Sequence, residues 1–135
     1  MSAPADDMMS LCKEILPARS KIIQRQMSYE RRQAGGQYIL VREVSSTDAP
    51  DVTVHVSTHD ITITVCGGIG ETGMQDGYDM AQALWMGLEL IHDRVVDGTL
   101  YTCVKTSSPI DESQTGLRTE YVFDVTMTRY YGGLV

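Results

Sequence analysis

A glycine-rich segment supplies the motif that comes nearest to a ligand-binding signature. Residues 68–73, Gly-Ile-Gly-Glu-Thr-Gly, have the spacing G-x-G-x-x-G and follow a stretch typical of a strand. In a dinucleotide-binding fold the helix begins inside this motif, so that its free N–H groups meet the pyrophosphate. Here the helical pattern begins near Tyr78, and Glu71 and Asp76 carry negative charge where phosphate would lie. We therefore expect a flexible glycine-rich loop over residues 66–77 and no bound nucleotide.

The histidines offer a second possible chemistry. His55, His59 and Asp60 lie close in sequence and could in principle hold a metal ion. The i, i+4 spacing brings two histidines together on a helix, however, and this segment alternates like a strand followed by a turn. His92 is expected on the surface of a helix. We expect no metal site and no cofactor.

The cysteines offer a third possibility, a nucleophilic thiol. Cys66 precedes two glycines, and His59 would lie near it on the same hairpin. The chain has three cysteines in all, with no C-x-x-C pair and no zinc-finger spacing: Cys12, Cys66 and Cys103. Buried thiols that act as small apolar groups in a reducing compartment are the simpler interpretation. No catalytic residue is expected.

The charge of the chain is unevenly distributed. Residues 1–43 carry seven basic and five acidic groups, whereas residues 44–135 carry four basic and thirteen acidic groups, so the net charge of −7 comes from the second part. An acidic body disfavours tight binding of nucleic acid, while a basic end can pair with acidic surfaces of other copies. The first residues lack the pattern of a secretory leader, and no apolar run reaches the length of a membrane span.

The first 36 residues are expected to form a helical arm. Apolar residues recur at spacings of three and four over residues 8–16, and Pro17 should end this helix. A second helical pattern covers residues 22–32 and stops at Gly35-Gly36. Residues 37–135 are expected to form an α+β sheet domain, and the whole chain, at 135 residues, makes one structural domain.

Alternating sequences predict the strands. Residues 38–44, 52–56, 61–65 and 100–106 are rich in β-branched and aromatic side chains, with loops expected at residues 45–51 and at His59-Asp60. In residues 120–128, apolar side chains occupy one face and mainly polar side chains the other, which fixes the register of this strand. The predicted fold is a central, mostly antiparallel sheet with helices packed on one side.

One strong helix is expected between these strands. Residues 78–95 place Ala81, Leu84, Leu88 and Ile91 on a single stripe. Asp76 can serve as the N-cap of this helix, and the glycine of Asp97-Gly98 ends the segment. The adjacent carboxylates Asp111-Glu112 are expected in a solvated loop.

The order of these elements resembles a known family. It combines the alternating strand 61–65, the amphipathic helix 78–84 and a loop, residues 108–118, that holds an acid and a Gly-Arg pair ahead of a long aromatic strand. Over residues 55–130 this arrangement resembles the tail-terminator or minor-capsid-like proteins of long-tailed bacteriophages. The resemblance implies a structural virion protein, made in the host cytoplasm, that is not an enzyme.

The resemblance also implies a mode of assembly. Such subunits form a six-membered ring that caps the tail tube and offers a docking face to the head connector, with DNA passing through the opening during ejection. Closed rings need head-to-tail interfaces. We expect the arm arginines to contact the acidic body of the next copy: Arg19, Arg25, Arg31 and Arg32. Glu71 and Asp76 are expected to line the opening.

Three other functions remain open from the sequence. The chain could be a tail-completion protein or neck adaptor, or it could be a tail-tube subunit, because tube proteins also combine a sheet with helices and form rings. A tube subunit should polymerise on its own, whereas a terminator should stop at a finite ring or stay monomeric. A small enzyme that uses Cys66 or the glycine-rich segment is the third alternative.

Overall fold

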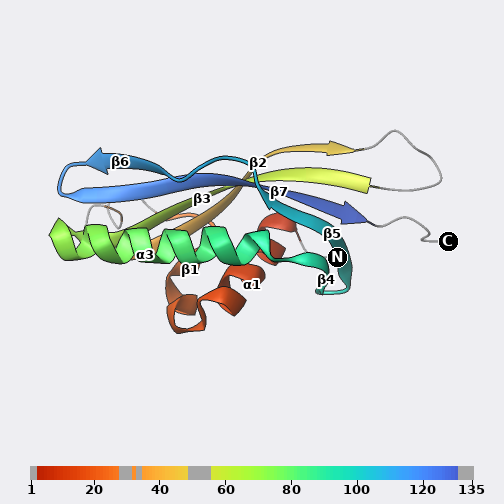
Figure 1. Ribbon diagram of the computed structural model, residues 1–135, viewed down its shortest axis with the longest axis horizontal. Helices are drawn as coiled ribbons and strands as arrows, with labels where there is room; N and C mark the ends of the chain where they lie inside the picture. Colours follow the sequence, from red (N-terminus) through yellow and green to blue (C-terminus); the bar gives the residue numbers. More distant parts are fainter. Residues whose placement is uncertain (1–2, 28–31, 33–34, 49–55, 131–135) are drawn as a thin grey trace.

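The computed structural model describes residues 3–27, 32, 35–48 and 56–130. Its elements, in chain order, are α1 (Pro4–Ile15), the 3-10 helix η1 (Pro17–Ile22), β1 (Ile23–Gln24), β2 (Tyr38–Asp48), β3 (Val56–Ile69), α3 (Gly70–Glu89), β4 (His92–Val96), β5 (Thr99–Thr106), β6 (Asp111–Thr115) and β7 (Arg118–Tyr130). The fold class is α+β, as the sequence predicts, with α1 and α3 on one face of the sheet (Figure 1).

Within the described residues, the strands form a single seven-stranded sheet in the order β1-β2-β3-β7-β5-β4, with β6 also paired to β7. The long strand β7 lies at its centre, because β3 pairs along one edge of β7 while β5 and then β6 pair along the other. These pairings are antiparallel, whereas β1 runs parallel to β2. One edge of the sheet is therefore formed by β1 and β2, and the other by β4 and β6.

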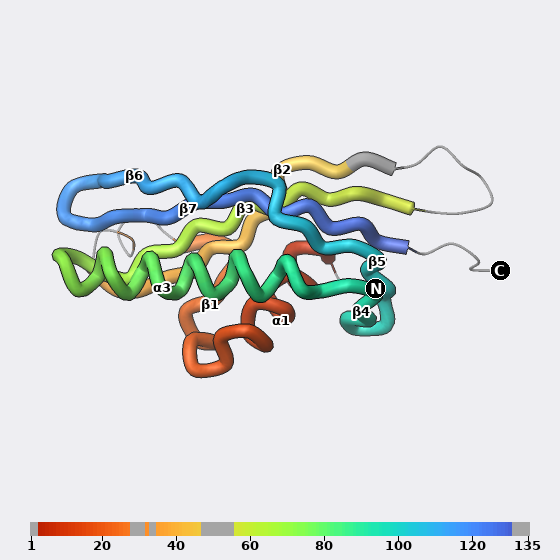
Figure 2. Tube along the Cα trace, viewed as in Figure 1, coloured from red at the N-terminus to blue at the C-terminus, as the bar shows by residue number. Residues whose placement is uncertain are grey.

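The core lies between the sheet and the two helices. Tyr121, Phe123, Val125 and Met127 of β7 are all buried on the helix-facing side, which confirms the predicted register. The four residues of the predicted helix stripe are also buried; they are Ala81, Leu84, Leu88 and Ile91. Met8, Leu11 and Cys12 of α1 join the same cluster of buried residues. The first helix thus shares its core with the sheet, and Figure 2 follows the chain from α1 beneath the sheet to β1 at its edge.

Helix α3 begins earlier and ends earlier than predicted. It starts at Gly70, eight residues before Tyr78, so Asp76 lies inside the helix and does not cap it. The glycine-rich loop expected at residues 66–77 is therefore wrong: β3 runs to Ile69 and passes directly into the helix. At the other end the helix stops at Glu89, and His92 lies in strand β4 instead of on a helix.

The arm begins with a helix, as predicted, but its described residues are not helical throughout. Helix α1 ends at Ile15, just before Pro17, close to the predicted stop. The second helix predicted for residues 22–32 is wrong at Ile23–Gln24, which form β1 and pair with Ile39 and Leu40 of β2. Parallel pairing with a buried strand satisfies backbone groups that a helix would otherwise satisfy internally.

Three predicted loops are strand, wholly or in part. His59-Asp60 lies within β3, where both residues pair with β2 and β7, so no hairpin turn forms there. Residues 45–48 continue β2 beyond the predicted end at Val44, and Asp111-Glu112 belong to strand β6. Residues 52–55, part of another predicted strand, lie outside the described residues. The strand predicted at residues 100–106 is confirmed as β5.

Candidate functional site

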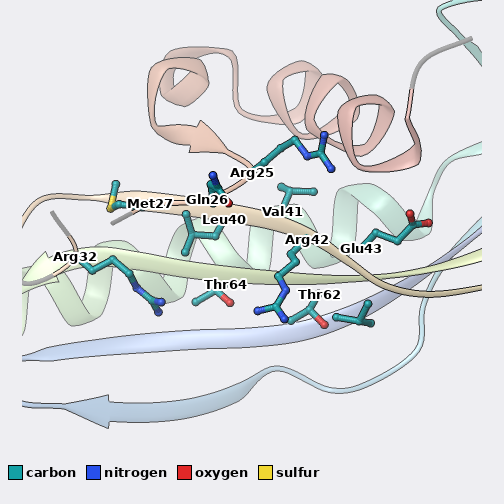
Figure 3. Close-up of a pocket in the computed structure, with 11 residues that line it drawn as sticks. Arg25, Gln26, Met27, Arg32, Leu40, Val41, Arg42, Glu43, Thr62 and Thr64 are labelled. Atoms are coloured by element: carbon teal, nitrogen blue, oxygen red, sulfur yellow. The ribbon is translucent and has the colours of Figure 1, made fainter. Parts of the chain in front are cut away.

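An open groove of about 840 Å³ lies beside β2. It lies between the open face of β2 and β3 and the segment that follows β1, and Figure 3 shows its lining residues. The lining residues are Arg25, Gln26, Met27, Arg32, Leu40, Val41, Arg42, Glu43, Val44, Thr62 and Thr64. We call this feature the basic groove, because three arginines line it against one carboxylate.

The alternation of β2 places Arg42 on the open face of the sheet. Arg42 pairs with Thr62 across the strands, whereas Val41 and Ile39 point to the core. The Arg42 side chain is exposed, and it makes no ion pair with any residue that the structure describes. Its full charge is therefore available to a partner. The sequence analysis did not select Arg42, although alternation over residues 38–44 already separates it from the apolar face.

Arg25 adds a second exposed charge to the groove. It follows β1 and lies 3.7 Å from a carboxylate oxygen of Asp6, with both side chains about half exposed to solvent. An ion pair this exposed holds the guanidinium weakly, so a partner can compete for it.

Arg32 is held by a buried cluster instead. Its Nη2 donates to Oε2 of Glu120 at 2.5 Å, and its guanidinium lies 5.6 Å from the centre of the Tyr38 ring. The Tyr38 hydroxyl donates to the same carboxylate oxygen. Burial alone would raise the pKa of Glu120, but the hydrogen bonds from Tyr38 and Arg32 outweigh it and hold this pKa below its usual value. Arg32 therefore also fastens its segment to β7.

The other predicted contact residues are placed differently. Arg19 in η1 donates to Oε1 of Gln37 at 2.7 Å, and the Gln37 amide in turn donates to the Gly67 carbonyl. Arg19 thus ties the arm to the sheet. Arg31 lies outside the described residues. Of the four predicted arginines, the structure brings Arg25 and Arg32 together in the basic groove.

The predicted acidic pair lies on α3. Glu71 is exposed in the first turn of the helix, whereas Asp76 is half-buried. Five positions on a helix turn the side chain by about 140°, so the two carboxylates do not share a face. The N–H of Gly70 donates to the Leu117 carbonyl at 3.1 Å. That bond uses a group which a bound phosphate would need, and β3 is antiparallel to its neighbours, unlike a dinucleotide-binding strand.

A chain of hydrogen bonds that looks like a hydrolytic triad occurs near the start of β3. Nε2 of His59 lies 2.7 Å from Oγ of Ser57, and its Nδ1 lies 2.5 Å from Oε2 of Glu43. Catalysis also needs a substrate within reach of the nucleophile. Ser57 is completely buried in the core, and the basic groove touches Glu43 but neither of the other two residues. We therefore interpret this network as a structural one that satisfies polar groups on a buried face.

Cys66 does not meet His59. Seven positions separate them on β3, which is roughly 23 Å along a strand and puts their side chains on opposite faces. Cys66 is buried between Tyr38 and Glu120 in the register, whereas His59 faces the helix side. Burial raises the pKa of the Cys12 thiol to about 12, so this group is not a nucleophile either.

This placement predicts the reactivity of the three thiols. In the folded protein we expect a thiol reagent such as DTNB to react with Cys103, the half-exposed cysteine, and to reach Cys12 and Cys66 only after unfolding. Absorbance titration with and without denaturant, with a Cys103→Ser variant as the control, measures this directly. Rapid reaction of Cys66 in the native protein would contradict the structural assignment.

Two further observations concern metal ligands and membrane spans. Within the described residues, no group of three or more metal-ligating side chains comes together. None of the helices described is both long and apolar enough to cross a bilayer.

The fold and the groove define a small α+β protein whose available chemistry lies on an open groove and on the edges of a sheet. No family model and no curated protein matches the sequence. Solved structures do match. One is a chain of a structure described as "Virion of native gene transfer agent (GTA) particle", which is 14% identical, with a TM-score of 0.67 over 96% of this chain and 100% of that chain. At this identity the match shows that the two chains share a fold.

Proposed function

We propose that this chain is a structural protein of a phage-like virion, and specifically the tail terminator that forms a ring on the end of the tail tube. The fold match carries this proposal, because it spans nearly the whole of both chains and the matched chain comes from a virion particle. The placement of the candidate catalytic groups also supports a structural role, because these groups are buried or lie far from one another.

The surface suits repeated contact between copies. Several large apolar side chains are exposed on α3 and just beyond its two ends, on β4 and at the turn that joins β6 to β7; they are Ile69, Met74, Tyr78, Met86, Leu90, Val95 and Leu117. Apolar groups of this kind mark contact surfaces when they gather near one another. Together with a basic groove on an acidic protein, they favour assembly through heterologous interfaces that can close into a ring.

Within that ring we propose roles for the residues selected from the sequence. Arg25 and Arg32 contact the neighbouring copy from the basic groove, and Arg19 and Arg31 support the same interface. Glu71, exposed at the start of α3, faces the opening, and Asp76 lies behind it. With a net charge of −7, the ring repels DNA phosphates, so DNA passes without specific binding.

The partners follow from the same role. One face of the ring, which we take to be hexameric, rests on the last ring of tail-tube protein, and the other receives the head connector or a neck protein. The chain has no enzymatic activity in this proposal. A tail-completion or neck-adaptor role and a tail-tube role differ from it only in position and in the capacity to polymerise.

Labelled particles test the position. We expect gold-labelled antibody against this chain to mark purified particles once, at the junction of head and tail, in negative-stain images. Label along the whole tail would instead identify a tube subunit, and label on the head side of the joint a neck adaptor. Particles that lack the chain altogether would refute the virion role. Particles from a strain without the gene, which should carry no label, provide the control.

A further inference from the structure

Two strand edges on opposite sides of the sheet are open in the described structure. On one side, β1 pairs only with Ile39 and Leu40, so the outer edge of β2 beyond residue 40 has no strand partner among the described residues. On the other side, β6 is exposed at all five positions and pairs with β7 along a single edge. Unpaired strand edges carry free N–H and C=O groups that readily pair with another chain.

The two open edges carry opposite charge. The outer edge of β2 borders the basic groove, where Arg42 is exposed and Arg25 is held only by a long ion pair. Strand β6 starts with Asp111 and Glu112, both exposed, and holds no basic residue. Because complementary edges lie on opposite sides of the molecule, each copy can offer one edge to each of two neighbours.

The side chains of the two edges also share a face. Arg42 pairs with Thr62, and Thr62 pairs with Asp124 on β7. Asp111 pairs with Val122, two residues from Asp124 and therefore on the same face of the sheet. If β6 of one copy extended the sheet of the next at β2, Asp111 would lie on the open face, where Arg42 also lies.

We propose that β6 of one copy adds as a strand to the free edge of β2 in the next copy, with Asp111 paired to Arg42 at the basic groove. Backbone hydrogen bonds supply affinity, and the charge pair sets the register and excludes the reverse contact. The contact is head-to-tail, so repetition gives a ring or a helical array, depending on the angle between copies. This inference rests on the proposed assembly role and names the surface that performs it.

A charge exchange tests the pairing. Sedimentation at low salt should show Arg42→Glu and Asp111→Lys each weakening self-association at least tenfold, since each variant places like charges at the contact. The double variant with both changes in one chain should restore association, and an equimolar mixture of the two single variants should also assemble. Raising salt from about 50 to 500 mM should weaken the wild type, because the Debye length falls well below 10 Å.

A matched control makes the same kind of charge reversal at another exposed position. Lys13→Glu reverses an exposed charge on α1, an element that forms neither strand edge, and should leave association unchanged. Hydrogen exchange should show residues 111–115 becoming protected on assembly. Circular dichroism confirms that each variant is folded, which is expected because Arg42 and Asp111 are both exposed.

The outcomes separate this inference from the proposed function. Assembly that ignores both charge reversals, a double variant that fails to recover, or a wild type that is monomeric at every concentration would each overturn the β6–β2 contact. None of these results would remove the chain from the virion, since the labelled-particle images decide that question independently.

Discussion

A Glu120→Ala variant is expected to lose about 3–5 kcal/mol of unfolding free energy, the amount typical of breaking a buried ion pair from one side. For a chain of this length, that loss lowers the melting temperature by roughly 10 °C or more. Glu120 is almost fully buried, and one carboxylate oxygen accepts from both Arg32 and Tyr38 while Arg118 lies 3.9 Å away. Removing the carboxylate leaves the buried Tyr38 hydroxyl and the partly buried Arg32 guanidinium without this acceptor.

An exposed ion pair of similar length provides the control. Glu14 binds Arg94 at 2.6 Å, but both side chains are about half exposed to solvent. Glu14→Ala should therefore cost less than about 1 kcal/mol. Thermal unfolding of the two variants and the wild type then compares the loss of a buried carboxylate with the loss of an exposed one, in ion pairs of similar length. Equal losses in the two variants would contradict the argument, because they would mean that burial adds nothing to the Glu120 cluster.

The same cluster predicts a pH dependence with a definite sign. Because the folded pKa of Glu120 lies below its usual value, its charge contributes stability above about pH 4, and this contribution disappears as pH falls through the lower folded value. A Glu120→Gln variant lacks the charge at every pH. The difference in unfolding free energy between wild type and Glu120→Gln should therefore be large at pH 7 and should shrink toward pH 3, as urea titrations would measure. A constant difference would contradict the assignment.

The sequence predicted those strands whose buried face is apolar. Strand β7 is the clearest case, since Tyr121, Phe123, Val125 and Met127 alternate with polar residues and all four are buried. Strand β3 was only partly predicted, because Ser57 and His59 occupy its buried face and interrupt the apolar alternation. Their burial is compensated by the hydrogen bonds to each other and to Glu43. A pairwise network of this kind leaves no periodic signal in the sequence.

Part of the candidate site was also predicted from the sequence. Charge segregation pointed to the arginines of the arm, residues 1–36, and Arg25 and Arg32 do line the basic groove. Arg42 was missed because its exposure depends on the open face of the sheet, which no helix described here covers. Asp111 was interpreted as a loop residue, since a fully exposed strand such as β6 has no alternation of apolar residues to reveal it.

Glycine misled the sequence analysis at the junction of β3 and α3, because local propensity treats glycine as a loop former whereas here it allows two elements to touch. A Cβ on Gly67 would lie 2.2 Å from the Gly73 carbonyl oxygen and 2.3 Å from the Gly77 amide nitrogen. A Cβ on Gly73 would lie 2.4 Å from backbone atoms of Gly68. Backbone atoms on both sides leave no flexible side chain to yield, so the strand can rest on the helix only where side chains are absent.

Gly73→Ala is therefore expected to destabilise the protein by about 3 kcal/mol, at the upper end of the usual cost of overpacking. The sign is informative, because alanine in place of glycine inside a helix ordinarily stabilises it by up to about 1 kcal/mol. Gly36→Ala, where a Cβ would meet nothing within 4 Å, should be close to neutral in the same denaturant titration. The double variant Gly67→Ala/Gly73→Ala should cost less than the sum of the single changes, because one contact is lost only once. A stabilised Gly73→Ala protein would mean that β3 and α3 are not in contact there, and the unbroken passage from strand to helix would need another explanation.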